Sequence, residues 1–109
     1  MTVQVDLNGL VIPDMKVLAA DEFESHNDWV GYVTEYDGIC GMSAEKLRGN
    51  EDLLVERLFE LSLIDAKMFS FYLNTRDEDS YIYFGGYENS FIEELTWVKV
   101  KSSHWEIEL

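Results

Sequence analysis

The sequence predicts a mainly β domain with one clear α-helix. Short strand-like runs follow one another between turn signals, the first run alternates apolar and polar residues, and one segment has helical spacing. Strands this closely spaced favour a sandwich or barrel-like sheet over alternating β and α units. The 109 residues are 47% hydrophobic, enough for one core, so residues 1–109 are expected to form a single domain.

The first element is expected to be a β-hairpin. Residues 2–7 alternate with a period of two, which is typical of a half-buried strand. Asn8-Gly9 follows, the dipeptide that best tolerates positive φ at both turn positions, and the apolar run 10–12 then returns. Residues 15–20 are predicted to form another strand, entered through Pro13-Asp14.

A polar, acidic loop over residues 21–29 is predicted to lead into a strand at 30–36 and a turn at Asp37-Gly38. The short apolar run 39–42 contains the single cysteine, Cys40, which can form no internal disulfide. Its small and apolar neighbours favour a buried, inert thiol.

The helix is expected over residues 51–61. Gly49-Asn50 precedes two acids, Glu51 and Asp52, which suits an N-cap and the positive end of a helix dipole. Leucines at 54, 58 and 61 recur at i, i+4 and i+7, so this segment predicts an amphipathic helix of about three turns.

The C-terminal half returns to predicted strands. A polar hairpin loop at 74–80 separates the first two, and Gly85-Gly86 ends the second. The predicted strands cover residues 68–73, 81–84, 95–100 and 105–109.

Charge excludes several partners. Twenty-two acidic residues face eight basic ones, giving a formal charge of −14, so the chain should repel nucleic acid and anionic membranes. No apolar stretch approaches the ~20 residues that span a bilayer. A basic start followed by an apolar run is absent, so we expect no signal peptide.

The residues alone indicate no catalytic or metal chemistry. His26 and His104 lie in separate polar stretches without further ligands at metal-binding spacing, so neither a metal nor a cofactor is expected. No Gly-x-Ser-x-Gly elbow occurs, and Gly85-Gly86 lacks the remainder of a phosphate loop. The acidic run 77–79 fits a solvated turn better than a calcium loop.

An ordered set of short motifs resembles the pepsin-like aspartic proteases. Residues 36–42 (Tyr-Asp-Gly-Ile-Cys-Gly-Met) resemble that family's Phe-Asp-Gly-Ile-Leu-Gly-Leu segment, and 68–73 resemble its Phe-Ser-x-Tyr-Leu strand. Residues 83–86 are similar to its Phe-Gly-Gly stretch. Further similarities lie at 2–5, at the helix and at the strand pair formed by 95–100 and 105–109. The six pieces occur in the family's order and cover nearly the whole chain.

The resemblance implies the central segment of a pepsin-like aspartic protease, namely the C-terminal part of the first lobe plus the strands leading to the second, without the catalytic residues. The family cleaves peptide bonds with two aspartates, each in an Asp-Thr/Ser-Gly motif, and this chain contains neither motif. Asp37-Gly38 is no substitute, because the resemblance places that aspartate outside the dyad. The isolated chain is therefore expected to be inactive, with no peptide hydrolysis at about pH 3–5.

By the same resemblance, Tyr36, Ile39 and Val30 form the wall of the pocket for the substrate residue before the scissile bond; ordinary core packing is the alternative for all three. Asp37, Gly38 and Gly41 take structural roles, with Gly41 permitting close backbone approach. Two departures from the family stand at Ser62, where a glycine commonly follows the helix, and at Glu93-Glu94.

Three hypotheses follow. The first is a segment of an aspartic endopeptidase whose parent enzyme acts on peptide or protein substrates in a secretory, vacuolar or lysosomal compartment. The second is a stand-alone, non-catalytic interaction or inhibitory module of the same fold. The third is an unrelated acidic β domain. A segment cut from a lobe leaves open strand edges and half a core, so we expect self-association.

Overall fold

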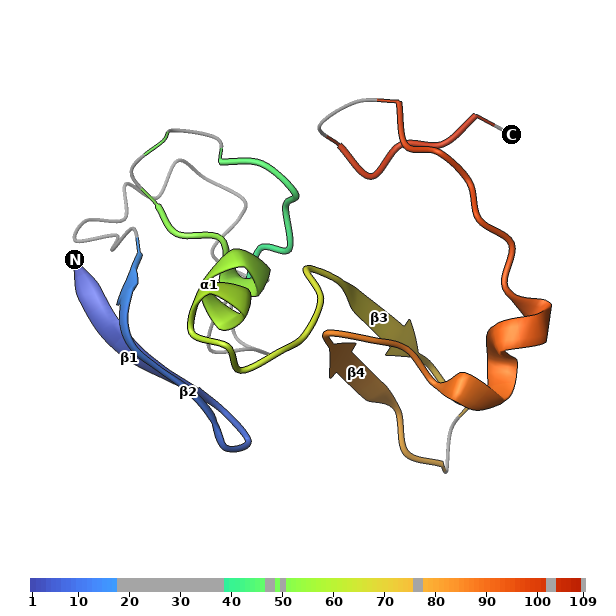
Figure 1. Cartoon of the computed structure of the whole chain (residues 1–109), viewed down its shortest axis with the longest axis horizontal. Helices are drawn as coiled ribbons and strands as arrows, with labels where there is room; N and C mark the ends of the chain where they lie inside the picture. The colour runs from blue at the N-terminus through green and yellow to red at the C-terminus, as the bar shows by residue number, and fades with distance from the viewer. Residues whose placement is uncertain (18–38, 47–48, 50, 76–77, 102–103, 109) are drawn as a thin grey trace, which may run out of the picture.

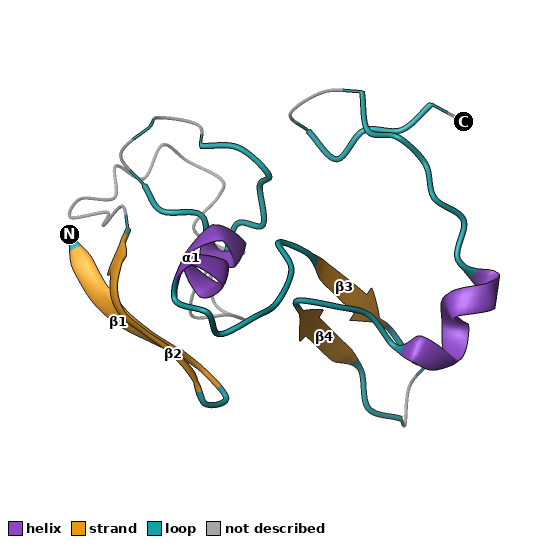
Figure 2. Ribbon diagram, viewed as in Figure 1, coloured by secondary structure: helices purple, strands orange, loops and turns teal. Residues whose placement is uncertain are grey.

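The computed structural model describes residues 1–17, 39–46, 49, 51–75, 78–101 and 104–108. In chain order it contains two strands, one α-helix, two further strands and a 3₁₀ helix. Figure 1 shows α1 between the β1–β2 hairpin and the β3–β4 hairpin, with the C-terminal segment rising from the 3₁₀ helix at the right and turning back toward the middle of the view. Figure 2 shows how much of the described chain outside these elements is loop. The predicted fold class, mainly β with one α-helix, is confirmed.

The first hairpin has the predicted turn. β1 (Thr2–Leu7) pairs antiparallel with β2 (Leu10–Lys16), and Asn8 and Gly9 have φ of 52° and 98°. Positive φ at both positions matches the right-handed twist of the two strands. The Gly9 amide also donates to Asp6 Oδ1 at 2.8 Å, which holds the turn closed.

The prediction of a separate strand beginning at residue 15 was wrong. β2 runs without interruption from Leu10 to Lys16, and residues 18–20 lie outside the described part of the chain. Val3 pairs with Met15 and Val5 with Ile12, so Pro13 and Asp14 together oppose one residue of β1. This is a β-bulge, which accommodates a proline because a residue in the bulge does not need to donate a backbone N–H to the partner strand.

Helix α1 (Leu54–Glu60) is confirmed but is shorter than predicted. The N-cap predicted at Gly49-Asn50 is also wrong, since Leu53 is the N-cap and contributes no side-chain hydrogen bond. Asp52 is engaged by β2 instead. Its Oδ2 accepts the Lys16 amide at 2.7 Å and its own amide donates to the Lys16 carbonyl at 3.1 Å. These two bonds hold the chain extended against β2 until Leu53.

The helix ends in a Schellman motif. Ser62 adopts φ of 55°, its amide donates to the Phe59 carbonyl, and the Leu63 amide donates to the Leu58 carbonyl, both at 2.9 Å. Ser62 therefore occupies the left-handed position that most often holds glycine.

The core lies where α1 packs on β2. The buried side chains come from β2, from one face of α1 and from the segment after it. They are Ile12, Met15, Leu54, Leu58 and Ile64. Leu54 and Leu58 are four residues apart, so the predicted helix face is the buried one.

The second hairpin is also confirmed. β3 (Phe69–Tyr72) pairs antiparallel with β4 (Tyr81–Phe84) in a continuous register from Phe69↔Phe84 to Tyr72↔Tyr81. Gly85 ends β4 with φ of 85°, and its amide donates to the Met68 carbonyl at 2.8 Å.

The C-terminal strands predicted at 95–100 and 105–109 are not formed in the described residues. Residues 95–100 and 105–108 are irregular, and a 3₁₀ helix that the sequence did not predict, η2 (Asn89–Glu94), precedes them. A strand needs a neighbouring strand for its backbone groups, and the described residues give these segments none. The described strands form two separate two-stranded sheets and close no barrel. No described helix is long and apolar enough to cross a membrane.

Candidate functional site

The segment that carries Ile39, Cys40 and Gly41 lies along a pocket between β1–β2 and the start of α1. The pocket has a volume of about 730 Å³ and its apolar lining includes Leu7 and Met15 from the hairpin. Ile39 is 86% exposed, so its side chain borders the pocket without being packed into the core.

The expectation of a buried thiol at Cys40 was wrong, because Cys40 is exposed. Residues 39–42 join no sheet in the described chain, and Met42 is the member of this run that packs against the core. Among the described residues, a Cβ built on Gly41 would meet no atom within 4 Å. The other predicted site residues, Val30, Tyr36, Asp37 and Gly38, lie outside the described residues.

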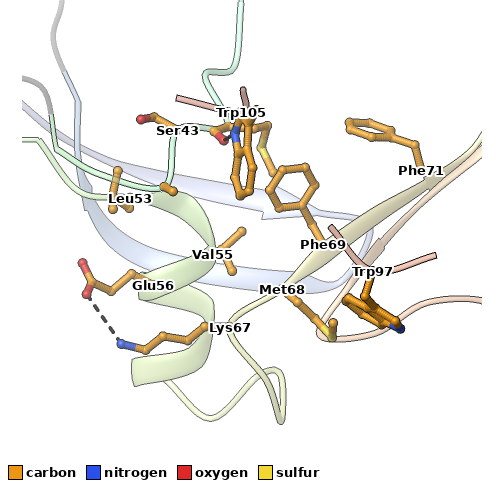
Figure 3. Close-up of a pocket in the computed structure, with 12 residues that line it drawn as sticks. Ser43, Leu53, Val55, Glu56, Lys67, Met68, Phe69, Phe71, Trp97 and Trp105 are labelled. Carbon is orange, nitrogen blue, oxygen red and sulfur yellow. Dashed lines mark hydrogen bonds and ion pairs between the residues drawn. The ribbon is translucent and has the colours of Figure 1, made fainter. Parts of the chain in front are cut away.

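A second pocket lies beside α1, and four aromatic side chains are among the residues that line it (Figure 3). Its volume is about 680 Å³. Phe69 and Phe71 come from alternate positions of β3, while Trp97 and Trp105 come from the C-terminal segment. Sequence reasoning missed this pocket, since only the fold brings residue 105 back to β3. We call these four residues the aromatic face.

Trp105 is fixed in this pocket by two contacts. Its indole Nε1 donates to the Met42 carbonyl at 2.7 Å, and its ring meets the Phe69 ring edge-to-face with centroids 5.5 Å apart. Phe69 makes a similar contact with Phe71 at 5.8 Å. Edge-to-face pairs of this kind add to the stabilisation from apolar burial. The run at 39–42 is thus tied to the C-terminal segment through Met42.

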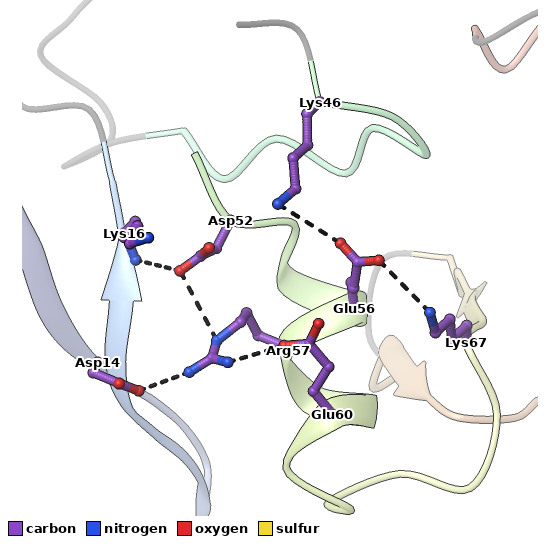
Figure 4. Close-up of polar contacts among 8 residues, drawn as sticks. All are labelled: Asp14, Lys16, Lys46, Asp52, Glu56, Arg57, Glu60 and Lys67. Carbon is purple, nitrogen blue, oxygen red and sulfur yellow. Dashed lines mark hydrogen bonds and ion pairs between the residues drawn. The ribbon is translucent and has the colours of Figure 1, made fainter. Parts of the chain in front are cut away.

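Charged side chains around α1 form structural ion pairs (Figure 4). Arg57 donates to Asp14 at 2.7 Å and to Glu60 at 2.9 Å, and its Nε lies 3.9 Å from Asp52. The pKa of Arg57 is raised, chiefly by the hydrogen bond to Glu60 and further by the nearby charge of Asp14. Burial acts in the opposite direction but is outweighed. Arg57 therefore bridges the bulge of β2 to α1 and remains cationic.

A second set of charges borders the aromatic pocket. Glu56 lies 3.6 Å from Lys67 and 4.0 Å from Lys46, and Lys67 Nζ also stands 5.3 Å from the centre of the Phe59 ring. The carboxylate of Glu56 is therefore balanced by cations beside the pocket.

On β4, Tyr83 donates its hydroxyl to Glu88 Oε2 at 3.0 Å, and Glu88 Oε1 accepts the Ser90 amide at the start of η2. These bonds, the one from Tyr83 foremost, hold the pKa of Glu88 below its ordinary value. The same bond raises the pKa of Tyr83. This pair joins β4 to η2 and faces neither pocket described above.

The described residues form apolar pockets and structural ion pairs. The sequence has no Asp-Thr-Gly or Asp-Ser-Gly, and the described His, Cys, Asp and Glu side chains form no group of three that could hold a metal ion.

Comparison with known protein families identifies the class of protein. The sequence model of the eukaryotic aspartyl protease family matches residues 1–109, so the chain belongs to that family. The order of the motifs at 36–42, 68–73 and 83–86 is thereby explained.

Among curated proteins, the chain is similar to plasmepsin IV from two isolates of Plasmodium falciparum. The identity is 36% over 80 residues in both cases, covering 70% of this chain. The match spans only 18% of the length of each plasmepsin. No solved structure matches significantly.

Proposed function

We propose that this chain is the part of a pepsin-like endopeptidase that forms one wall of the substrate cleft and the packing beneath it. The observation that carries the proposal is a family match over all 109 residues in a sequence that has neither catalytic motif. The catalytic aspartates would then come from polypeptide outside these residues, and the chain alone would be inactive.

The inactivity follows from the chemistry of the dyad. Two nearby carboxylates cannot both ionise easily, so they share a proton and together activate the attacking water. The described carboxylates around α1 are instead committed to cations, as at Arg57 and Lys67.

The cleft-wall role is supported by the position of Ile39. Its exposed side chain stands at the rim of a pocket whose lining includes Val5, Leu7 and Met15. Such a surface suits the hydrophobic side chain of a peptide, because binding would remove apolar area from water on both sides. Val30 and Tyr36 stay predicted members of the same wall.

Two measurements on the purified chain test this function. We expect no pepstatin-sensitive cleavage of a quenched fluorescent peptide at about pH 3–5, with an active pepsin-like enzyme as the positive control. Pepstatin-sensitive turnover would show that the dyad is present. In a methyl NMR titration with a Leu-Phe hexapeptide, the Ile39 signal should shift and saturate while that of Val11 on β2 stays unmoved. Equal shifts at both positions would contradict the assigned wall.

A stand-alone binding module of the same family would also be silent in the peptidase assay. The native transcript separates the two. Codons for Asp-Thr/Ser-Gly on both sides of this region would support the endopeptidase segment, whereas in-frame stops or replaced aspartates would support the module.

A further inference from the structure

The two pockets described above share a wall, residues 39–45, which we call the wall segment. Ile39 and Gly41 line the pocket beside β1–β2, whereas Met42 lines the aromatic pocket beside α1. Ser43 lines both pockets. Because one segment borders both cavities, a contact that fixes the segment from the aromatic pocket also acts on the pocket that Ile39 borders.

The wall segment forms neither helix nor strand, so its position depends on individual contacts. Ser43 and Glu45 make hydrogen bonds with each other, at 2.8 and 3.3 Å, and these only shape the local turn. In the described chain, the hydrogen bond that joins the wall segment to a distant part of the sequence runs from the indole Nε1 of Trp105 to the Met42 carbonyl, at 2.7 Å. This bond therefore holds the segment from outside.

Met42 is the residue through which Trp105 acts on the wall segment. Its side chain packs against the buried core, and its carbonyl accepts the bond from Trp105. Ile39 lies three residues earlier, at most about 11 Å along the chain, and is 86% exposed. Since no described strand pairing lies between these two residues, the position of Ile39 follows from where Met42 is held.

The Trp105 ring is itself oriented by β3. It meets the Phe69 ring edge-to-face at 5.5 Å (Figure 3), and Phe69 is fixed in turn by its pairing with Phe84 on β4. The indole N–H is therefore directed at the Met42 carbonyl by the hairpin. A donor oriented in advance loses little side-chain freedom when it makes its bond.

We propose that Trp105 is a positioning residue for the substrate-binding wall. Its indole N–H fixes the Met42 carbonyl and thereby keeps Ile39 at the rim of the pocket beside β1–β2. This role rests on the cleft-wall function proposed above and adds a residue to it that touches no substrate. Without the bond, the wall segment would occupy its binding position for only part of the time, and the apparent affinity for a peptide would fall by that fraction.

The methyl NMR titration with the Leu-Phe hexapeptide tests this role on the full chain with two matched variants. Trp105→Phe keeps an aromatic ring and removes the N–H donor, and Trp97→Phe removes an indole from the same pocket. Under conditions in which circular dichroism shows both variants folded, Trp105→Phe should raise the dissociation constant of the hexapeptide about three- to tenfold. Trp97→Phe should change it by less than about twofold. Before any peptide is added, Trp105→Phe alone should move the Ile39 methyl signal.

Equal weakening of hexapeptide binding by both variants, or by neither, would overturn the positioning role and leave the cleft wall standing. A hexapeptide that leaves the wild-type Ile39 signal unmoved would instead refute the cleft wall. In that case the signal of the peptide-free Trp105→Phe chain decides the positioning role, which an unmoved Ile39 methyl would overturn.

Should Trp105→Phe fail to fold, hydrogen exchange of the indole protons in the wild-type chain gives an independent readout. Coupling between two events is reciprocal, so saturating hexapeptide should slow exchange of the Trp105 indole proton by the same factor of about three to ten. The indole proton of Trp97 should exchange at an unchanged rate. An unchanged rate at Trp105, or equal slowing at both tryptophans, would overturn the positioning role.

Discussion

Gly85 and Gly86 are adjacent, yet the structure predicts opposite consequences for an added methyl group. Gly85 has φ of 85°, and a Cβ built there would lie 2.8 Å from the Cβ of the buried Ile64 and 3.3 Å from its Cγ2. Gly86 has no positive φ, and a Cβ there would meet no atom of the described residues within 4 Å.

Two costs add at Gly85→Ala. The left-handed conformation costs a residue with a Cβ about 1–2 kcal/mol, and forcing an extra carbon against a buried side chain costs about 1–3 kcal/mol more. We therefore expect Gly85→Ala to lower the free energy of unfolding by about 2–5 kcal/mol. Gly86→Ala should be neutral or stabilising by up to about 1 kcal/mol, because alanine restricts the unfolded chain.

Urea unfolding followed by circular dichroism measures both variants against the wild type at one protein concentration. Fixing the concentration matters, since any self-association would add to the apparent stability. If Gly85→Ala costs no more than Gly86→Ala, the turn after β4 does not press on Ile64 as described, and the reasoning fails.

Three further predictions concern the helix end, the core and the bond between β4 and η2. Ser62→Gly should raise the free energy of unfolding by about 0.5–1 kcal/mol, because glycine relieves the left-handed strain but loses more backbone entropy on folding. In the same urea experiment, Ser62→Ala should leave the free energy of unfolding nearly unchanged. An equal gain from alanine would contradict this account. Leu58→Ala removes a fully buried side chain and should lower the free energy of unfolding by about 2–5 kcal/mol. Thermal unfolding should show a clearly smaller loss for Phe59→Ala, because Phe59 is exposed. Tyr83→Phe should raise the pKa of Glu88 toward 4.5, observed by carbon NMR titration of its carboxyl. Because the pKa of Glu88 is depressed in the folded chain, the bond from Tyr83 stabilises the fold above about pH 4.5, and that stabilisation is lost on acidification. A Tyr83→Phe chain in which Glu88 keeps its wild-type pKa would refute the assigned cause.

The parts of the fold that the sequence predicted are those determined by nearby residues. Asn8-Gly9 specifies its own turn, and the leucines at 54 and 58 specify one helix face, without reference to the rest of the chain. The β3–β4 pairing likewise joins runs separated by one short loop.

The errors arose where distant residues decide the structure. The helix begins late because Asp52 binds the backbone of Lys16, 36 residues away. Residues 95–100 have the composition of a strand, but strand propensity depends on a partner that the described chain does not offer.

The candidate site was predictable only in part. The motif at 36–42 pointed to Ile39, and the family match supports that origin. Its exposure, and that of Cys40, could not be predicted, because burial depends on which neighbouring segments cover a short apolar run. The aromatic pocket gave no local signal, since its aromatic members come from β3 and from the far end of the chain.

The bond from Trp105 to the Met42 carbonyl joins residues 63 positions apart and holds the end of the chain to its middle. Around it, residues 95–100 and 105–108 contribute no regular backbone pairing, while α1 and β2 share the buried core. Segments with few buried contacts open at a lower free energy than the core does. In native-state hydrogen exchange, the amides of the C-terminal segment should therefore lose protection well before those of α1. Trp97 and Trp105 would then leave and rejoin the aromatic face while β3 and the remainder of the described fold stay formed.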